Sequence, residues 1–317
     1  MRKIIFAAIA IVASCPLAQA QFVVTKKSGT PEQISGNVVF TPNADRTAWS
    51  VGDKYNADLD LSNIESIALG AIETPAKAGD YFYSDGTWST ELDATKTPIG
   101  VVFYAGDPGV NDAALRAAHP GCTHGLVVGL KQKQTEWQDD YAGFDDEVGT
   151  TVGEWIAENT DYVSIATRSE AMTSVFNQIM GYNNTCGIDA FNDGEYGWDY
   201  EVLVGSGVSS LMSSYKAPAS TSGWYVPSVK EVSLICSGTT NGSIGDLGYE
   251  PETPDNANAT LINERLAKIA GADTLSGMYW SSTEYSANQV HTVYFKNGLV
   301  MQTSKGGNNY LRPVLAF

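Results

Sequence analysis

The sequence predicts an α+β protein, and two observations support this class. Segments with the composition of strands occupy the N-terminal and C-terminal parts of the chain, whereas segments with helix start and stop signals lie between them. Strands and helices that are grouped in this way, rather than strictly alternating, are typical of α+β folds. The dipeptide Asn297-Gly298, between two strand-like runs, adds a strong hairpin signal near the C-terminus.

Residues 1–20 have the three parts of a secretory signal peptide. A basic start is followed by the apolar run 4–13, which is too short to span a membrane, and by the small-residue site Ala18-Gln19-Ala20. Cleavage after Ala20 is the main expectation. The alternative is a bacterial lipoprotein signal with a lipid anchor at Cys15. Both alternatives predict an exported protein, either secreted or held at the cell surface as an outer-membrane lipoprotein.

The segment 21–78 reads as a β-rich N-terminal part, because 37–41 and 66–72 are strand-like and are separated by polar and Gly/Pro-containing stretches. From Gly79 onward the composition becomes rich in Gly, Trp and Tyr, and we place the start of a second domain, 79–317, there. Its first buried strands are expected at 98–104 and 124–130.

Three helices are predicted in the middle of the chain. Thr167-x-x-Glu170 is a capping box, and Gly181 stands where a C′ glycine would end that helix. A second capping box, Ser228-x-x-Glu231, precedes a helix that Gly238 would end. The third helix is expected over 260–270, before Gly271.

Strands return after Gly277. A two-residue loop at 297–298 would place Tyr294 opposite Met301 and Thr292 opposite Thr303. Alternation then puts Val293, Phe295 and Val300 on a core face. Thr292, Tyr294, Lys296, Leu299, Met301 and Thr303 fall on the other face, which is either an ordinary solvent face or a recognition surface.

The net charge of −17 argues against binding to nucleic acid or to an anionic membrane, and removal of the signal peptide makes it more negative. No later apolar run approaches the length of a membrane helix. Cys122, Cys186 and Cys236 allow at most one disulfide, with Cys186–Cys236 as a guess.

Four segments resemble, in this order, a family of bacterial surface domains with a C-type lectin-like fold. They are "SGWYVPSVKEVSLI", "GMYWSSTEYS", "HTVYFKNGLV" and "YLRPVLAF". The family includes the C-terminal domain of collagen-like adhesins and the lectin-fold variable proteins diversified by retroelements. The segments 79–89, 98–104 and 122–130 look like the opening strands of the same family. The resemblance therefore covers about 79–317, and it implies a C-type lectin-like fold for this part.

In the diversified members the segment between "WSSTEYS" and "RPVLAF" looks like the ligand-facing surface. Arg312, in contrast, is expected to make a buried structural bond. The resemblance therefore implies a ligand-binding set composed of Asn288, Gln289, His291, Tyr294, Lys296, Leu299, Met301, Thr303, Ser304 and Asn308. Strand alternation, however, places His291 on the same face as the core residues Val293 and Phe295. No Asp or Glu follows Tyr285. A face with Lys296 and Lys305 could therefore receive an acidic glycan or an acidic protein loop without repulsion.

Other patterns in the sequence that could indicate a chemical site are weaker than the ligand-binding pattern of the hairpin. His119, Cys122 and His124 lack a fourth zinc ligand by spacing, and a turn is favoured there. The acidic stretch 137–149 offers oxygen ligands, but it lacks a calcium-loop pattern and reads as a solvated loop. No catalytic or nucleotide-binding motif is evident. We expect no metal, no cofactor and no enzymatic activity.

The sequence thus predicts an exported, adhesin-like surface protein that binds an extracellular glycan or protein through the hairpin and the adjoining loop. The alternative is a structural subunit of a surface or fimbrial assembly. A less favoured alternative is an enzyme on the scaffold of formylglycine-generating enzymes.

Overall fold

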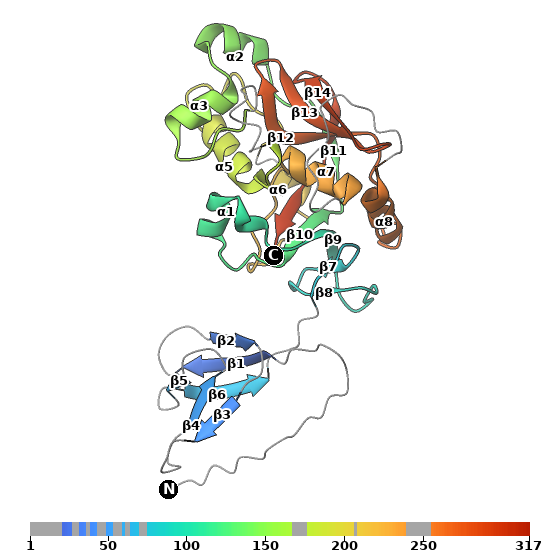
Figure 1. The fold of residues 1–317 in the computed structure, drawn as a ribbon. Coiled ribbons are helices and arrows are strands. Elements are labelled where there is room, and N and C mark those ends of the chain that lie inside the picture. The colour runs from blue at the N-terminus through green and yellow to red at the C-terminus, as the bar shows by residue number, and fades with distance from the viewer. Residues whose placement is uncertain are drawn as a thin grey trace. The chain divides into compact units, whose positions relative to one another are not determined.

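A computed structural model describes two parts of the chain. It gives the backbone of strands between residues 21 and 69, and it describes residues 75–166, 176–205, 208–238 and 255–317. The chain divides into two compact units, residues 1–74 and residues 75–317, and each is described by itself (Figure 1). The predicted signal peptide, Cys15 and the capping box at Thr167 lie outside the described residues.

The first unit is built from strands. β1 pairs with β2 and β6 in one antiparallel sheet, and β4 pairs with β3 and β5 in another. The strands are β1 (Gln21–Lys26), β2 (Glu32–Ser35), β3 (Val39–Pro42), β4 (Trp49–Gly52), β5 (Leu59–Asp60) and β6 (Ile64–Leu69). β3 and β6 overlap the two strand-like segments that were predicted in this part.

The second unit contains two five-stranded sheets (Figure 1). The first has the order β16-β10-β9-β7-β8, and the second has the order β11-β15-β12-β13-β14. The strands of the first sheet are β7 (Tyr81–Tyr83), β8 (Trp88–Ser89), β9 (Pro98–Ala105), β10 (Gly125–Gly129) and β16 (Val314–Ala316). Those of the second are β11 (Lys133–Thr135), β12 (Met278–Ser286), β13 (Gln289–Tyr294), β14 (Leu299–Ser304) and β15 (Asn309–Leu311).

The predicted C-terminal strand is divided between the two sheets. β15 pairs with β11 and β12, whereas β16 pairs with β10. Pro313 stands between them, and a proline has no backbone N–H to donate to a ladder. The last residues therefore tie both sheets together.

The helices lie between the sheet-forming segments, so the unit is α+β as predicted (Figure 1). The described helices are the 3₁₀ helix η2 (Pro108–Val110), α1 (Ala113–Ala118), α2 (Tyr141–Val148), α3 (Val152–Asn159), α5 (Gly181–Asn192), α6 (Val208–Leu211), α7 (Val229–Ser237) and α8 (Ala257–Leu266).

Helix α7 begins and ends as its sequence predicts. Ser228 is the N-cap, its hydroxyl accepts from the backbone N–H of Glu231, and the Glu231 carboxylate accepts from the backbone N–H of Ser228. Gly238 follows with φ of +71°, the left-handed conformation that glycine tolerates best.

Two helix predictions need correction. Gly181 does not end a helix but is the first residue of α5, where its close approach to the Glu231 carboxylate and the Ser228 backbone leaves no room for a Cβ atom. Helix α8 begins and ends a few residues earlier than the predicted 260–270, because Asn256 accepts the first helical hydrogen bond from Thr260.

Helices α7 and α8 pack between the two sheets. Their apolar side chains share one buried cluster with Val101 and Val128 of the first sheet and with Tyr279 and Val293 of the second. A second cluster covers the opposite face of the second sheet, where Trp280 packs with side chains of α2, α3 and α5. The second sheet is therefore enclosed on parts of both faces.

Cys122, Cys186 and Cys236 carry free thiols, so the guessed Cys186–Cys236 disulfide is wrong. Burial raises the pKa of Cys122 to about 11 and that of Cys236 to about 12. Of the helices in the described residues, none has both the length and the apolar composition that crossing a membrane requires.

Candidate functional site

The β13–β14 ribbon carries most of the predicted ligand-binding residues, and its register differs from the prediction. Tyr294 lies opposite Leu299 and Thr292 lies opposite Met301, so four residues rather than two form the connection. Gly298 has φ of +81°, but Asn297 does not have the positive φ that a type I′ turn needs.

The predicted faces nevertheless persist, because the register is displaced by two residues and side chains alternate with a period of two. Val293, Phe295 and Val300 are all buried, in the cluster between the sheets. Thr292 and Thr303 lie on the other face, where their hydroxyl oxygens are 2.7 Å apart.

A contact with the start of α8 replaces the predicted two-residue turn. The backbone N–H of Asp255 donates to the carbonyl of Asn297 over 3.0 Å, and the side-chain amide of Asn256 donates to the carbonyl of Lys296 over 2.8 Å. A Cβ atom on Gly298 would come within 2.5 Å of the Asp255 carbonyl oxygen. The conformation of the hairpin connection is thus determined by contacts with a segment distant in sequence. A prediction from local turn propensity does not take such contacts into account.

The predicted ligand-binding residues differ in accessibility. His291 is fully buried, so the expectation that it faces a ligand is wrong, in agreement with its core parity. The exposed members are Asn288, Lys296, Ser304 and Asn308, and the half-buried members are Gln289, Tyr294, Leu299, Met301 and Thr303.

The outer face of the ribbon is not free along its whole length. On this face Val290 belongs to the second buried cluster, together with Trp280 of the neighbouring β12, and Thr292 is fully buried. The hydroxyl of Tyr141 in α2 lies 3.0 Å from that of Ser304. What stays accessible is a smaller patch near the connection between the strands. We define the hairpin surface as Tyr294, Lys296, Leu299, Met301 and Thr303.

Lys305 does not contribute a positive charge to this surface. Its side chain is fully buried and pairs with Glu284 at 2.6 Å. The expected binding face with two lysines therefore retains only Lys296 as an exposed cation.

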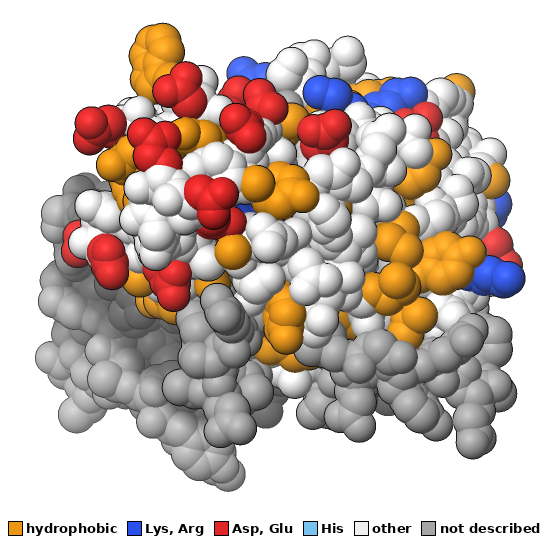
Figure 2. Space-filling model, turned by 90° about the horizontal axis from the view of Figure 1, so that it is seen from above, with side chains coloured by type: hydrophobic (Ala, Val, Ile, Leu, Met, Phe, Trp, Pro, Cys, Tyr) orange, Lys and Arg blue, Asp and Glu red, His pale blue; other side chains and the backbone are white. Residues whose placement is uncertain are grey.

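A second candidate site is a hollow of about 650 Å³ beside α3. Its lining combines carboxylates with aromatic rings, and it consists of Val148, Gly149, Thr150, Glu154, Trp155, Glu158, Asn159, Glu195 and Tyr196. Figure 2 shows acidic side chains gathered on one part of the face that it draws. Carboxylates and aromatic faces together suit a positively charged group.

The acidic stretch 137–149 is not the solvated loop that was expected. Residues 141–148 form α2, whose Phe144 is buried against Phe191 of α5. In the described parts of the chain, three or more His, Cys, Asp or Glu residues are nowhere grouped so that they could hold a metal ion.

The histidines and the cysteine of 119–124 are dispersed. His119 Nε2 lies 3.1 Å from the hydroxyl of Tyr182, whereas the Cys122 thiol donates to the carbonyl of Ala316. The backbone N–H of His124 donates to the carbonyl of Phe317. These residues lead into β10, as the turn interpretation predicts.

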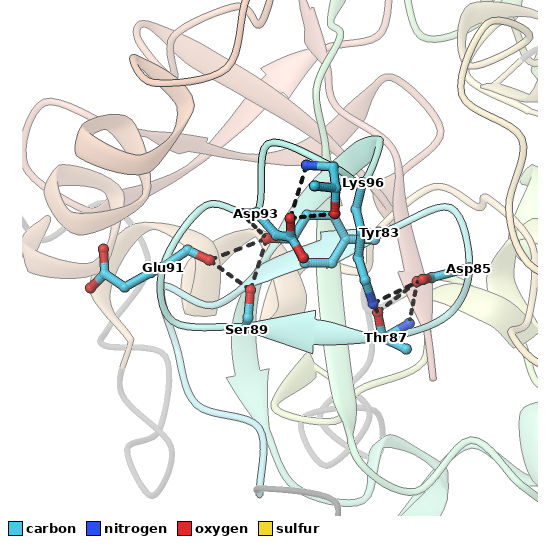
Figure 3. Close-up of polar contacts among 8 residues, drawn as sticks. Tyr83, Asp85, Thr87, Ser89, Glu91, Asp93 and Lys96 are labelled. Carbon is cyan, nitrogen blue, oxygen red and sulfur yellow. Dashed lines mark hydrogen bonds and ion pairs between the residues drawn. The ribbon is translucent and has the colours of Figure 1, made fainter.

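The loops around β7 and β8 hold another concentration of polar side chains (Figure 3). The Asp85 carboxylate accepts from the Thr87 hydroxyl at 2.6 Å and pairs with Lys96 at 2.9 Å, and these contacts lower its pKa to about 2. Tyr83 donates to the Glu91 carbonyl and accepts from the backbone N–H of Asp93. The bonds are internal to the loops and explain their shape, so this cluster is structural.

Comparisons with known proteins point to fimbriae. A relative from Bacteroides ovatus (strain ATCC 8483), provisionally named as the fimbrium tip subunit Fim1C, is 26% identical over 244 residues. The match covers 69% of this chain but 41% of the relative, so the chain spans about two fifths of that protein's length. No protein-family model matches the chain.

A solved structure has a similar fold. The crystal structure of a fimbrial protein from Bacteroides ovatus ATCC 8483 superposes with a TM-score of 0.61 at 21% identity. The superposition covers 94% of this chain and 71% of that chain, and it therefore includes strands of the first unit as well as the second. At this identity the likeness shows the fold alone.

Proposed function

We propose that the protein is a structural subunit of a bacterial surface fimbria. The observation that carries the proposal is the similarity to the Fim1C relative over 244 residues. The solved fimbrial protein supports it at the level of the fold. The expected signal peptide supports it independently, because a fimbrial subunit must leave the cytoplasm.

Filament localisation tests this proposal. Fimbriae sheared from cells that express the full chain would be collected and analysed by mass spectrometry beside the stripped cells. We expect the chain in the filament fraction and, by immunogold labelling, on the filaments themselves. An abundant outer-membrane protein serves as the control for membrane carry-over. A chain that stays with the stripped cells or in the culture supernatant would exclude a fimbrial subunit.

We propose further that the hairpin surface makes a contact with a protein or glycan partner outside the chain. Tyr294, Leu299 and Met301 are apolar or aromatic and half-buried, and Lys296 is exposed beside them. Aromatic and Met side chains are enriched in protein interfaces. The resemblance of 79–317 to C-type lectin-like surface domains agrees with this location, and a C-type lectin-like arrangement of the second unit forms part of the proposal.

Variants of the full chain separate the two proposals. Tyr294→Ala and Met301→Ala should weaken capture of purified fimbrial subunits, or of a ligand found on a glycan array, by about 1 kcal/mol or more each. Lys296→Ala should also weaken this capture, and Lys268→Ala, at another exposed lysine, is its matched control. Unchanged binding by all three hairpin variants would exclude this surface, while localisation to filaments would still support the fimbrial proposal.

A further inference from the structure

Lys305 and Glu284 form an ion pair that is closed to solvent. Nζ of Lys305 lies 2.6 Å from Oε1 of Glu284, and both side chains are 0% exposed. The same nitrogen donates to Oε1 of Gln138 over 3.0 Å and lies 5.2 Å from the centroid of the Trp137 ring. Burial removes both groups from water, so these contacts replace the hydration that an exposed ion pair keeps.

The second oxygen of Glu284 meets a helix N-terminus. Oε2 accepts a hydrogen bond of 2.7 Å from the backbone N–H of Gly153, the second residue of α3. Backbone N–H groups at this end of a helix stabilise negative charge, and such donors stabilise the oxyanion that forms when a nucleophile adds to a carboxyl carbon. A nucleophile and an oxyanion donor therefore contact the two oxygens of one carboxyl group.

Asp145 of α2 is a third acid, and the charges of this ion pair act on it. Both side-chain oxygens of Asp145 are buried and accept no hydrogen bond from any residue of the described chain. Burial raises the pKa of Asp145 to about 7, the positive charge of Lys305 lowers it, and the negative charge of Glu284 raises it further. Asp145 is thus partly protonated near neutral pH, which reduces its repulsion of the Glu284 carboxylate.

We propose that Lys305 and Glu284 condense to an intramolecular amide bond. The carboxylate of Glu284 first takes a proton from the Lys305 ammonium group. The nitrogen lone pair then forms a bond to Cδ of Glu284, and the charge that develops on Oε2 faces the N–H of Gly153. The nitrogen then gives a second proton to Oε1, which leaves as water. One ammonium and one carboxylate give one amide and one water, without an oxidant or a cofactor.

The proposed bond would link β12 to the residue that follows β14. It would close a covalent loop around the whole β13–β14 ribbon, and closing a loop lowers the entropy of the unfolded chain. The inference is independent of the fimbrial proposal, because it depends only on the buried cluster.

Mass spectrometry of the purified full chain under denaturing conditions tests the bond directly. We expect a mass lower by one water molecule than the sequence requires, with the chain start defined by the N-terminal peptide of a digest. Fragmentation should assign the link to the side chains of Glu284 and Lys305. An unshifted wild-type mass, or a link between other side chains, would overturn the proposal. The measurement does not depend on whether any variant folds.

Two variants test the roles of the residues. Lys305→Met removes the nucleophile and should restore the full mass. Lys131→Met, at a lysine that pairs with Asp273 instead, is the matched control and should keep the loss of one water. A mass that stays lower by one water in Lys305→Met would exclude Lys305 as the nucleophile.

Discussion

The rings of Tyr279 and Phe295 pack against each other, with their centroids 4.3 Å apart and their planes inclined by 41°. Tyr279 belongs to β12, and Phe295 follows β13 directly, so the pair joins neighbouring strands on the face that α7 covers. Aromatic pairs in such geometry contribute about 0.5–1.5 kcal/mol beyond the burial of their area. This contact holds the hairpin against the core.

Phe295→Ala should therefore lower the free energy of unfolding by about 3–5 kcal/mol, as the loss of a buried aromatic ring typically does. Tyr294→Ala, at the half-buried neighbouring position, should cost about 1 kcal/mol. Urea denaturation of both variants measures the difference. Equal losses would mean that the two faces of the ribbon are assigned wrongly.

Ser228→Ala removes the N-cap of α7 and should lower the free energy of unfolding by about 0.5–2 kcal/mol, because the backbone N–H of Glu231 loses its acceptor. The exposed Ser213 provides the control, and Ser213→Ala should be close to neutral. Thermal denaturation followed by circular dichroism would compare them. A neutral Ser228→Ala variant would contradict the role of the cap.

Gly298→Ala should destabilise the protein more than Gly271→Ala does. Both glycines have positive φ, but a Cβ atom at Gly298 would lie 2.5 Å from the Asp255 carbonyl oxygen, whereas at Gly271 it would meet open space. The positive φ alone costs a non-glycine residue about 1 kcal/mol. The excess loss at Gly298 in urea denaturation measures the contact with Asp255, and equal losses would argue against that contact.

His291 should make stability depend on pH. Burial lowers its pKa from 6.5 to about 4, so the folded protein binds this proton more weakly than the unfolded chain does. The neutral His291 ring therefore contributes fully to the free energy of unfolding above pH 6.5. This contribution, about 3 kcal/mol in total, is lost as the pH falls toward 4. Urea denaturation of the wild type and of His291→Phe from pH 4 to pH 7 would show it. Parallel curves would contradict the burial of this ring.

Local patterns predicted the elements whose determinants are local. Ser228, Glu231 and Gly238 define the ends of α7 within one short segment, and the apolar runs of β9 and β10 are continuous in sequence. The side-chain alternation of the hairpin also depends only on strand periodicity, which explains why its faces were predicted although its register was not.

The errors arise where distant segments meet. The contact of Asp255 with Asn297 determines the hairpin connection, and the two residues are far apart in sequence. Lys305 was predicted to lie on an accessible face because no acid follows Tyr285 in the sequence. Its partner is Glu284, the residue directly before Tyr285, and the fold brings Glu284 and Lys305 together. The expected buried bond of Arg312 is confirmed, since its guanidinium donates to the carbonyl of Gly129 over 2.7 Å.

One missed element did carry a local signal. Thr151-x-x-Glu154 is the same capping box that identified α7, and both of its hydrogen bonds are present at the start of α3. Glu154 and Trp155 of that helix line the hollow of about 650 Å³. The acidic composition of the preceding stretch had favoured a loop in this region.

The buried thiols of Cys122 and Cys236 can report on local opening of the second unit. With pKa values of about 11 and 12, both stay protonated at neutral pH, and the thiolate is the form that alkylating reagents attack. One sulfur contacts the carbonyl of Ala316 and the other contacts those of Asp255 and Phe295. Labelling kinetics at each sulfur would therefore time the opening of two separate regions, around the chain end and around the hairpin.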